Sequence, residues 1–257
     1  GWSGLERQYE SLLRGKKGVS YFQVDAFGRE AGNVEGHDNS LPQPGQDIYT
    51  TLDINLQELL ESEFRGKKGA GIVSNPKTGG ILSYVSSPDY APDLFTGLIS
   101  RNDWKSIITD PDKPLLNRVS NGTYPPGSIY KMVVAFELLE KNFVSTDWEI
   151  LCTGSYEFYD RTFRCWNQFG HGKVNLEKAI IQSCDVFFYQ AIQNVNLDDL
   201  KIRSKQFLHG IRTNIDLPTE MKGRVPDRQF MNNLYGRWGW SKGALLNLSI
   251  GQGELLV

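Results

Sequence analysis

Residues 124–131 read YPPGSIYK, and they lead into the most apolar run of the chain. Its two prolines stiffen the chain in an extended form, and the glycine after them adds a flexible residue before Ser128. The run that follows, residues 132–136, is apolar and has the composition of a buried helix. The sequence therefore predicts a helix over residues 128–139, with Ser128 at its N-terminus.

Ser128 and Lys131 form a candidate nucleophile and base. A serine three residues before a lysine on a helix places both side chains on one face, where the amine can take the hydroxyl proton. The helix N-terminus favours a developing oxyanion, and burial would favour the neutral amine that acts as a base. Taken alone, the pattern also fits a serine N-cap beside a solvated lysine.

A second Ser-x-x-Lys pattern, from Ser74 to Lys77, does not predict another nucleophile and base. Pro76 lies between the two residues and breaks helical geometry. Apolar, β-branched runs at residues 70–74 and 81–86 predict two antiparallel strands joined by a hairpin loop. We therefore expect Ser74 and Lys77 not to share a face.

Ser183 and Asp185 are candidates for a proton relay. They lie where two predicted helices meet, over residues 176–182 and 185–195, and a kinked junction there would aim both side chains into a cleft. The letters alone are a weak signal, because helix capping is the commoner use of such residues. Equivalent letters occur at Ser87-Pro88-Asp89 and Ser145-Thr146-Asp147.

The composition excludes several classes of protein. The chain has 257 residues, 39% of them hydrophobic and 23% charged, which suits one sizeable core, or one domain with a smaller appendage, and excludes disorder. Its 28 Lys and Arg against 30 Asp and Glu give a net charge of −2, which excludes the basic footprint of a nucleic-acid partner. No apolar run reaches the roughly 18 to 20 residues of a spanning helix, so we expect any anchor to lie outside this sequence.

Residues 1–45 and 46–257 are predicted to be separate domains. The first 36 residues are rich in Gly and charge around a short apolar-alternating run, which predicts a small strand-rich segment, and a connector with two prolines follows. Beyond the boundary, Asp53 as N-cap and apolar residues at offsets of 3, 4 and 8 predict a helix over residues 54–64. Residues 87–124 are polar and aperiodic, and we expect a long functional loop there.

Three cysteines and one of the three histidines fall close together, at Cys152, Cys165, His171 and Cys184. Three thiolates and an imidazole are a complete tetrahedral ligand set for structural zinc, although no Cys-x-x-Cys knuckle is present. The alternative is a disulfide between Cys152 and Cys165, with Cys184 buried. The other two histidines, His37 and His209, lie in polar or loop-like surroundings with no partner pattern, and we expect both at the surface.

Six short motifs follow one another along the chain. They are GLERQY (4–9), TLD (51–53) with Leu56-Gln57, YPPGSIYK (124–131), GHG (170–172), SCD (183–185) with Phe188-Tyr189, and GQG (251–253). In this order they resemble the class B penicillin-binding proteins, most closely the elongation type, penicillin-binding protein 2. The resemblance covers essentially the whole chain, and the combination is far more specific than any one motif.

The resemblance implies an α+β fold, the transpeptidase fold that is shared with serine β-lactamases. In that fold an antiparallel sheet is flanked by helices, and Ser128 stands at the head of a buried central helix. Residues 1–45 would be the remnant of a non-catalytic pedestal domain of the dimerisation type, and residues 46–257 the transpeptidase domain.

The resemblance also implies a peptidoglycan D,D-transpeptidase. Ser128 is then the acylated nucleophile, and its backbone N–H is half of the oxyanion hole. Lys131 is the general base, Ser183 returns a proton to the leaving amine, and Asp185 stands where many relatives carry Asn. The substrates implied are stem peptides ending in D-Ala-D-Ala, β-lactams would be trapped at the same step, and the chemistry needs no cofactor.

The sequence departs from the family at the third motif, Lys-Thr-Gly, which in the family follows the relay motif in chain order. The letters of Lys77-Thr78-Gly79 match, but they lie 51 residues before Ser128, in the predicted hairpin loop. We expect the sequence to be a fragment that lacks the C-terminal part of the transpeptidase domain. A non-catalytic scaffold or binding module of the cell-wall machinery is the alternative, and residues 1–45 disfavour a serine β-lactamase or β-lactam sensor.

The resemblance finally bears on zinc and on partners. Some relatives hold zinc beside the active site with carboxylate, His and Cys ligands. His171 and Cys184 match that pattern, Cys165 falls where a carboxylate is usual, and Cys152 follows from its residue type alone. A zinc there would pin the loop that carries Ser183. The partners implied are a rod-shape glycosyltransferase and a rod-complex scaffold protein, at the periplasmic face of the bacterial inner membrane.

Overall fold

The computed structural model describes residues 2–34 and 38–257. The chain divides into two compact units: unit 1 is Gly1–Asn121 with Asn214–Glu220, and unit 2 is Gly122–Thr213 with Met221–Val257. The domain boundary that we predict after residue 45 does not coincide with this division and stays a prediction. His37, expected at the surface, lies outside the described residues.

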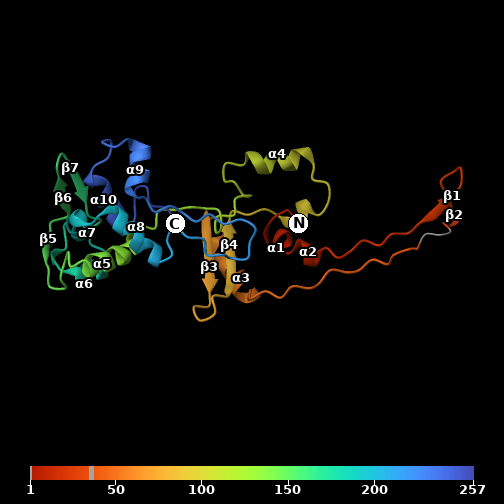
Figure 1. Cartoon of the computed structure of the whole chain (residues 1–257), viewed down its shortest axis with the longest axis horizontal. Coiled ribbons are helices and arrows are strands. Elements are labelled where there is room, and N and C mark those ends of the chain that lie inside the picture. The colour runs from red at the N-terminus through yellow and green to blue at the C-terminus, as the bar shows by residue number, and fades with distance from the viewer. Residues whose placement is uncertain (1, 35–37) are drawn as a thin grey trace. The chain divides into compact units, whose positions relative to one another are not determined.

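Unit 1 contains short helices, a β-hairpin that comes early in the chain and a helix-covered strand pair (Figure 1). The predicted strand-rich segment does form a hairpin, but two helices precede it. In chain order the elements are α1 (Gly4–Gln8), α2 (Glu10–Leu13), β1 (Phe22–Val24), β2 (Glu30–Asn33), α3 (Ile54–Phe64), β3 (Gly69–Ser74), β4 (Ile81–Ser87), the 3₁₀ helix η1 (Pro92–Phe95) and α4 (Arg101–Thr109).

The predictions for α3, β3 and β4 are confirmed. The Asp53 side chain accepts hydrogen bonds from the backbone N–H groups of Asn55 and Leu56, which begins α3. The strands β3 and β4 pair antiparallel, and α3 packs against them. A Cβ on Gly71 would lie only 2.8 Å from the Phe64 ring, so the missing side chain lets α3 approach β3 closely.

The prediction of an irregular loop over residues 87–124 is wrong in part, because η1 and α4 lie within it. The Ser100 hydroxyl accepts a hydrogen bond from the Asp103 N–H and donates one to its carboxylate. This Ser-x-x-Asp capping pattern was the signal for a helix there.

Unit 2 consists of helices together with two further strand pairs (Figure 1). In chain order its elements are η2 (Gly127–Tyr130), α5 (Lys131–Glu140), β5 (Ile150–Cys152), β6 (Ser155–Phe158), β7 (Arg161–Arg164), β8 (Gly172–Val174), α6 (Leu176–Ile181), α7 (Asp185–Ala191), η3 (Ile192–Asn194), α8 (Leu197–Gln206), α9 (Arg228–Tyr235) and α10 (Lys242–Ser249).

The core of unit 2 forms around α5 and α7. Val134 and Leu138 of α5 are fully buried, as are Phe187 and Phe188 of α7. The predicted helix over residues 128–139 is present, but its first turn is the 3₁₀ helix η2 and α5 continues from it. The burial of α5 fixes the backbone that carries Ser128 and Lys131.

The α+β prediction is confirmed, since helices accompany the antiparallel pairs β1–β2, β3–β4, β5–β8 and β6–β7. Within residues 2–34 and 38–257, none of the helices has the length and apolar character needed to cross a membrane.

Candidate active site and metal centre

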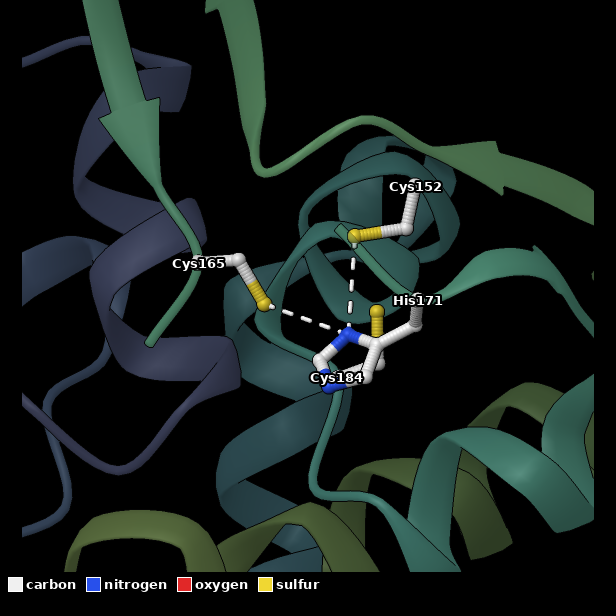
Figure 2. A group of neighbouring side chains, drawn as sticks. All are labelled: Cys152, Cys165, His171 and Cys184. Atoms are coloured by element: carbon white, nitrogen blue, oxygen red, sulfur yellow. Dashed lines mark hydrogen bonds between the residues drawn. The ribbon is translucent and has the colours of Figure 1, made fainter. Parts of the chain in front are cut away.

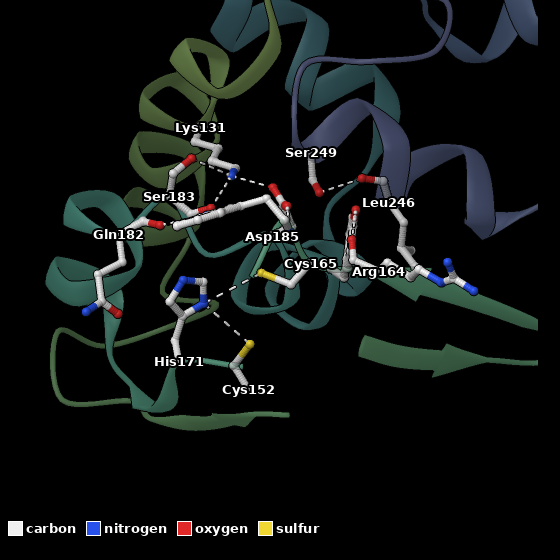
Figure 3. A network of polar contacts seen from close by, with 12 residues as sticks. Lys131, Cys152, Arg164, Cys165, His171, Gln182, Ser183, Asp185, Leu246 and Ser249 are labelled. Atoms are coloured by element: carbon white, nitrogen blue, oxygen red, sulfur yellow. Dashed lines mark hydrogen bonds and ion pairs between the residues drawn. The ribbon is translucent and has the colours of Figure 1, made fainter. Parts of the chain in front are cut away.

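Lys131 is the centre of a buried polar cluster in unit 2 (Figure 3). Its Nζ lies 2.6 Å from Asp185 Oδ1, 3.0 Å from Ser183 Oγ and 2.9 Å from the Ser183 carbonyl oxygen. The side chains of Lys131 and Asp185 are only 3% and 11% exposed. Burial of an ion pair is tolerated only where hydrogen bonds satisfy its polar atoms, and here three acceptors surround the amine.

The kinked junction predicted between α6 and α7 brings Ser183 and Asp185 to Lys131. Ser183 follows α6 with a φ of +52°, in the left-handed region, and Asp185 is the first residue of α7. A non-glycine residue at positive φ is uncommon and persists only where its surroundings hold it. The strained turn therefore aims the Ser183 hydroxyl and its own carbonyl at one amine.

Trp166 holds this junction, and the sequence analysis did not predict it. Its backbone N–H donates to Asp185 Oδ2 over 3.1 Å, and its indole Nε1 donates to the Gln182 carbonyl over 2.9 Å. Both oxygens of the Asp185 carboxylate thus have a partner. A backbone donor is the same in every residue type, so no sequence signal could have identified the first contact.

Ser128 lies in η2, one turn before Lys131, and is exposed. Its hydroxyl makes no hydrogen bond to any residue that the structure describes. Catalytic hydrogen bonds are often long or absent without substrate and tighten in the complex. Ser128 is therefore open to an incoming substrate, while Lys131 is already fixed by its partners.

The Gly251-Gln252-Gly253 motif packs directly against the turn that carries Ser128. The Gly127 N–H donates to the Gly251 carbonyl over 2.9 Å. Gly251 has a φ of +73°, and a Cβ there would lie 2.0 Å from the Gly127 oxygen. Only glycine satisfies both conditions, so this contact sets the position of the backbone next to Ser128.

We expect Gly251→Ala to lower the stability by about 2–4 kcal/mol, because strain at positive φ adds to an overpacked contact. It should also slow the acylation by benzylpenicillin that we expect at Ser128, by roughly tenfold or more. Gly79→Ala is the matched control: its φ is +76° and a Cβ there meets nothing within 4 Å. Urea unfolding and acylation rates check both variants, and equal effects would contradict the close-contact argument.

Tyr130 ties η2 to α8. Its hydroxyl lies 2.5 Å from Ser204 Oγ, and Ser204 donates to the Leu200 carbonyl, so Tyr130 is the donor in the first contact. Burial raises the pKa of Tyr130 to about 12, which keeps it a donor.

His209 packs on the Tyr130 ring with centroids 5.7 Å apart. The prediction of a surface His209 is wrong, since the residue is half-buried and burial lowers its pKa.

The four predicted metal ligands come together in unit 2 (Figure 2). The ligand atoms of the three cysteines and His171 all lie within 4.8 Å of one another, and His171 Nδ1 is 3.6 Å from the sulfurs of Cys152 and Cys165. The three cysteines are buried and free, so the alternative disulfide is not formed. The ligands come from the end of β5, the end of β7, the start of β8 and the start of α7.

These positions fit a tetrahedral zinc ion. Zinc bonds of about 2.3 Å to sulfur and about 2.0–2.1 Å to nitrogen place adjacent S and N ligands about 3.6 Å apart. Burial, and then the neighbouring Cys152, raise the pKa of the Cys184 thiol, so a thiolate there requires a cation. His171 Nε2 is buried and lacks a hydrogen-bond partner in the described part of the chain, leaving Nδ1 as the nitrogen that faces the sulfurs.

The similar patterns that we set aside lie elsewhere. Ser74, Lys77 and the Lys77-Thr78-Gly79 letters belong to the β3–β4 hairpin of unit 1, as predicted. Neither the Ser87-Pro88-Asp89 nor the Ser145-Thr146-Asp147 pattern has a side chain among the partners of the Lys131 amine in the described residues.

Two family models match the chain. The model of the penicillin binding protein transpeptidase domain matches residues 69–257, and that of the penicillin-binding protein dimerisation domain matches residues 1–50. Among curated proteins, the peptidoglycan D,D-transpeptidase MrdA of Escherichia coli K12 is 34% identical over 252 residues, which cover 97% of this chain and 39% of that protein. MrdA of Acinetobacter baumannii is 36% identical over 254 residues, covering 97% of this chain and 37% of that protein.

Solved structures give the same result for the fold. A complex between penicillin-binding protein 2 and MreC from Helicobacter pylori matches with a TM-score of 0.87 and 34% identity, over 100% of this chain and 48% of that one. Penicillin-binding protein 2 of Pseudomonas aeruginosa, in complex with WCK 5153, matches with a TM-score of 0.83 and 35% identity, over 100% and 52%. The chain spans about two fifths of the length of the curated relatives it matches.

Proposed function

The chain belongs to the penicillin-binding protein transpeptidase family, and from this premise we propose that its protein is a serine D,D-transpeptidase of cell-wall elongation. Its substrates are peptidoglycan stem peptides that end in D-Ala-D-Ala. One observation carries the proposal: a buried lysine, held by Ser183 and Asp185, follows one turn after the exposed Ser128. A surface N-cap serine would have no need of such a partner.

Acylation begins when Ser128 Oγ attacks the carbonyl carbon between the two D-Ala residues. Lys131 Nζ first gives a proton to Asp185 Oδ1, 2.6 Å away, and the neutral amine then takes the Ser128 hydroxyl proton as the C–O bond forms. The Ser128 N–H stabilises the oxyanion. Ser183 Oγ, 3.0 Å from Lys131 Nζ, relays a proton to the leaving amine as the C–N bond breaks. D-Ala departs and leaves an acyl-enzyme on Ser128.

The second half-reaction joins two stems. The amine of a neighbouring stem peptide attacks the acyl-enzyme carbonyl and loses a proton through the same Lys131–Ser183 pair. Ser128 leaves with its proton restored, and a new amide bond cross-links the stems. A β-lactam enters by the first step and acylates Ser128, but it offers no departing D-Ala to make room for an acceptor.

The partners and location follow the relatives. The Helicobacter pylori relative was solved with MreC, and another neighbour is titled as a peptidoglycan synthase complex that coordinates polymerization and crosslinking. These support a rod-complex scaffold protein and a rod-shape glycosyltransferase as partners, with no nucleic acid. The proposed location is the periplasmic face of the bacterial inner membrane, with a membrane anchor outside this chain.

A cross-linking assay tests the activity. The protein that carries this chain, at its natural length, is incubated with a synthetic stem pentapeptide ending in D-Ala-D-Ala and an acceptor stem. We expect free D-Ala and cross-linked dimer by mass spectrometry, and neither after preincubation with benzylpenicillin. A folded protein that yields neither product would contradict the proposal and support the non-catalytic scaffold.

We also propose that Cys152, Cys165, His171 and Cys184 hold a structural zinc ion. The donor set, its burial and its spacing support the metal. Bound there, zinc would keep the thiols as thiolates and cross-link the β5–β8 region to the start of α7. Cys184 lies between Ser183 and Asp185, so the ligand bond would hold both residues in register with Lys131.

Metal analysis tests the zinc site. We expect about one zinc per chain in the purified protein, retained by Cys152→Asp, which keeps an anionic ligand, and lost in Cys152→Ala. Three thiols should react after denaturation with a chelator, matching the three cysteines. Metal-free protein with a single reactive thiol would contradict the proposal and indicate the disulfide.

A further inference from the structure

A pocket of about 370 Å³ in unit 2 lies apart from the cluster around Lys131. It is lined by the C-terminal half of α8, the segment that follows Met221, and the first turns of α9. Its described lining carries four cationic side chains, Lys201, Lys205, Lys222 and Arg224, against the one carboxylate of Asp227. This imbalance contrasts with a chain whose net charge is −2.

Asp227 neutralises only one of these cations. Its Oδ2 pairs with Lys201 Nζ, and its Oδ1 accepts the Phe230 N–H over 2.6 Å as the N-cap of α9. The hydrogen bond from Lys201 is the main cause that lowers the pKa of Asp227. The Asp227 carboxylate is therefore ionised and already paired with Lys201, so it does not neutralise the other cations that line the pocket.

The other three cations have no ion-pair partner in the part of the chain that the structure describes. Lys205 and Lys222 have no hydrogen-bond or ion-pair partner within residues 2–34 and 38–257. Arg224 donates from Nε to the backbone carbonyl of Glu254 over 3.0 Å, and its guanidinium lies 4.8 Å from the Phe230 ring centroid. Three positive charges that face one pocket repel one another, and an anion among them removes that repulsion.

The wall that carries Lys222 and Arg224 is held in place. The backbone of Arg224 exchanges two hydrogen bonds with Leu256, and Gly223 between the two cations has a φ of +69°. A Cβ on Gly223 would lie 2.5 Å from the Leu256 oxygen. A fixed backbone in this wall reduces the ordering cost of binding to that of the side chains.

We propose that this pocket binds a phosphate-bearing anion of about the size of a diphosphate. Lysine ammonium groups and the outer nitrogens of arginine are the groups that bind phosphate oxygens by charge-assisted hydrogen bonds. The three uncompensated charges match the charge of a diphosphate, and the volume leaves room for part of the molecule that carries it. The site shares no lining residue with the Lys131, Ser183 and Asp185 cluster.

Titration of inorganic pyrophosphate into the full-length protein at low ionic strength tests the site. We expect saturable binding of about one equivalent, weakened at least tenfold in the variant Lys205→Gln/Lys222→Gln. Both lysines are exposed, so the variant should keep the parent's thermal unfolding. Lys16→Gln/Lys17→Gln, which removes the same charge from two exposed lysines in unit 1, should bind as the parent does.

A second arm separates free phosphate from a lipid headgroup. The same proteins, each in detergent micelles, are titrated with short-chain phosphatidylglycerol, and with short-chain phosphatidylcholine as the neutral reference. The proposal is supported if only the pocket variant loses binding of pyrophosphate or of phosphatidylglycerol. The ligand whose binding is lost shows whether the phosphate comes from a free anion or from a lipid headgroup. Absence of binding in both arms, or equal binding by both lysine variants and the parent, would overturn it.

Discussion

Ser128→Ala should lower the rate of D-Ala release from a stem peptide by roughly 10⁴-fold or more. The reason is that the variant lacks the hydroxyl that attacks the substrate carbonyl. Ser128 is the exposed residue one turn before the fixed Lys131 amine, and the covalent step has no route without its oxygen. The residual rate should not respond to benzylpenicillin. Single-turnover kinetics with a stem-peptide donor measure the effect.

Ser74→Ala is the matched control, because Ser74 belongs to the other Ser-x-x-Lys pattern of the chain. It lies in the β3–β4 pair, where Pro76 and the hairpin keep it off any helix, and its loss should leave the rate within about twofold. An equal loss in both variants would mean that Ser128 acts through the fold and not as the nucleophile.

Asp185→Ala should lower the free energy of unfolding by about 3–5 kcal/mol, since it leaves the Lys131 ammonium buried without its counter-charge. The Lys131 side chain is 3% exposed, so water cannot replace the lost carboxylate. The same variant should lose most of its transpeptidase activity, because Lys131 and the Ser183 turn share that anchor. Urea unfolding by tryptophan fluorescence, in buffer with constant zinc, measures the stability.

Two further variants separate the cost of leaving a buried charge unpaired from the cost of losing an ion pair. The double change Lys131→Met/Asp185→Leu should recover part of the stability while remaining inactive, because two apolar side chains have no charge to desolvate. Asp199→Ala removes the partner of Lys141 in a pair that is 40–44% exposed, and should cost less than about 1 kcal/mol. Similar costs for Asp185→Ala and Asp199→Ala would contradict the buried-pair argument.

Local signals in the sequence were sufficient for much of the fold. The Asp53 cap and the apolar spacing after it predicted α3, and β-branched runs around a polar loop predicted β3 and β4. These elements depend on neighbours in the chain. The strands β5 and β8 have three residues each, too few for a periodic pattern, and they form only because residues far apart in the sequence pair.

The candidate site, too, could be predicted only in part from the sequence. The Ser-x-x-Lys offset of a helix predicted Ser128 and Lys131. The Ser-Cys-Asp letters, where two predicted helices meet, predicted the Ser183 and Asp185 that lie around the Lys131 amine. Trp166 could not be predicted, since its contact with Asp185 is made by a backbone N–H. The prediction for His209 failed because the Tyr130 ring that covers it comes from another element, far away in the sequence.

The most direct test of the central claim, that Ser128 is the nucleophile of a transpeptidase, is intact-protein mass spectrometry after incubation with benzylpenicillin. The full-length protein should gain the mass of one penicilloyl group, and peptide mapping should find it on Ser128. A folded protein that gains no mass, or that carries the adduct on another residue, would contradict the account.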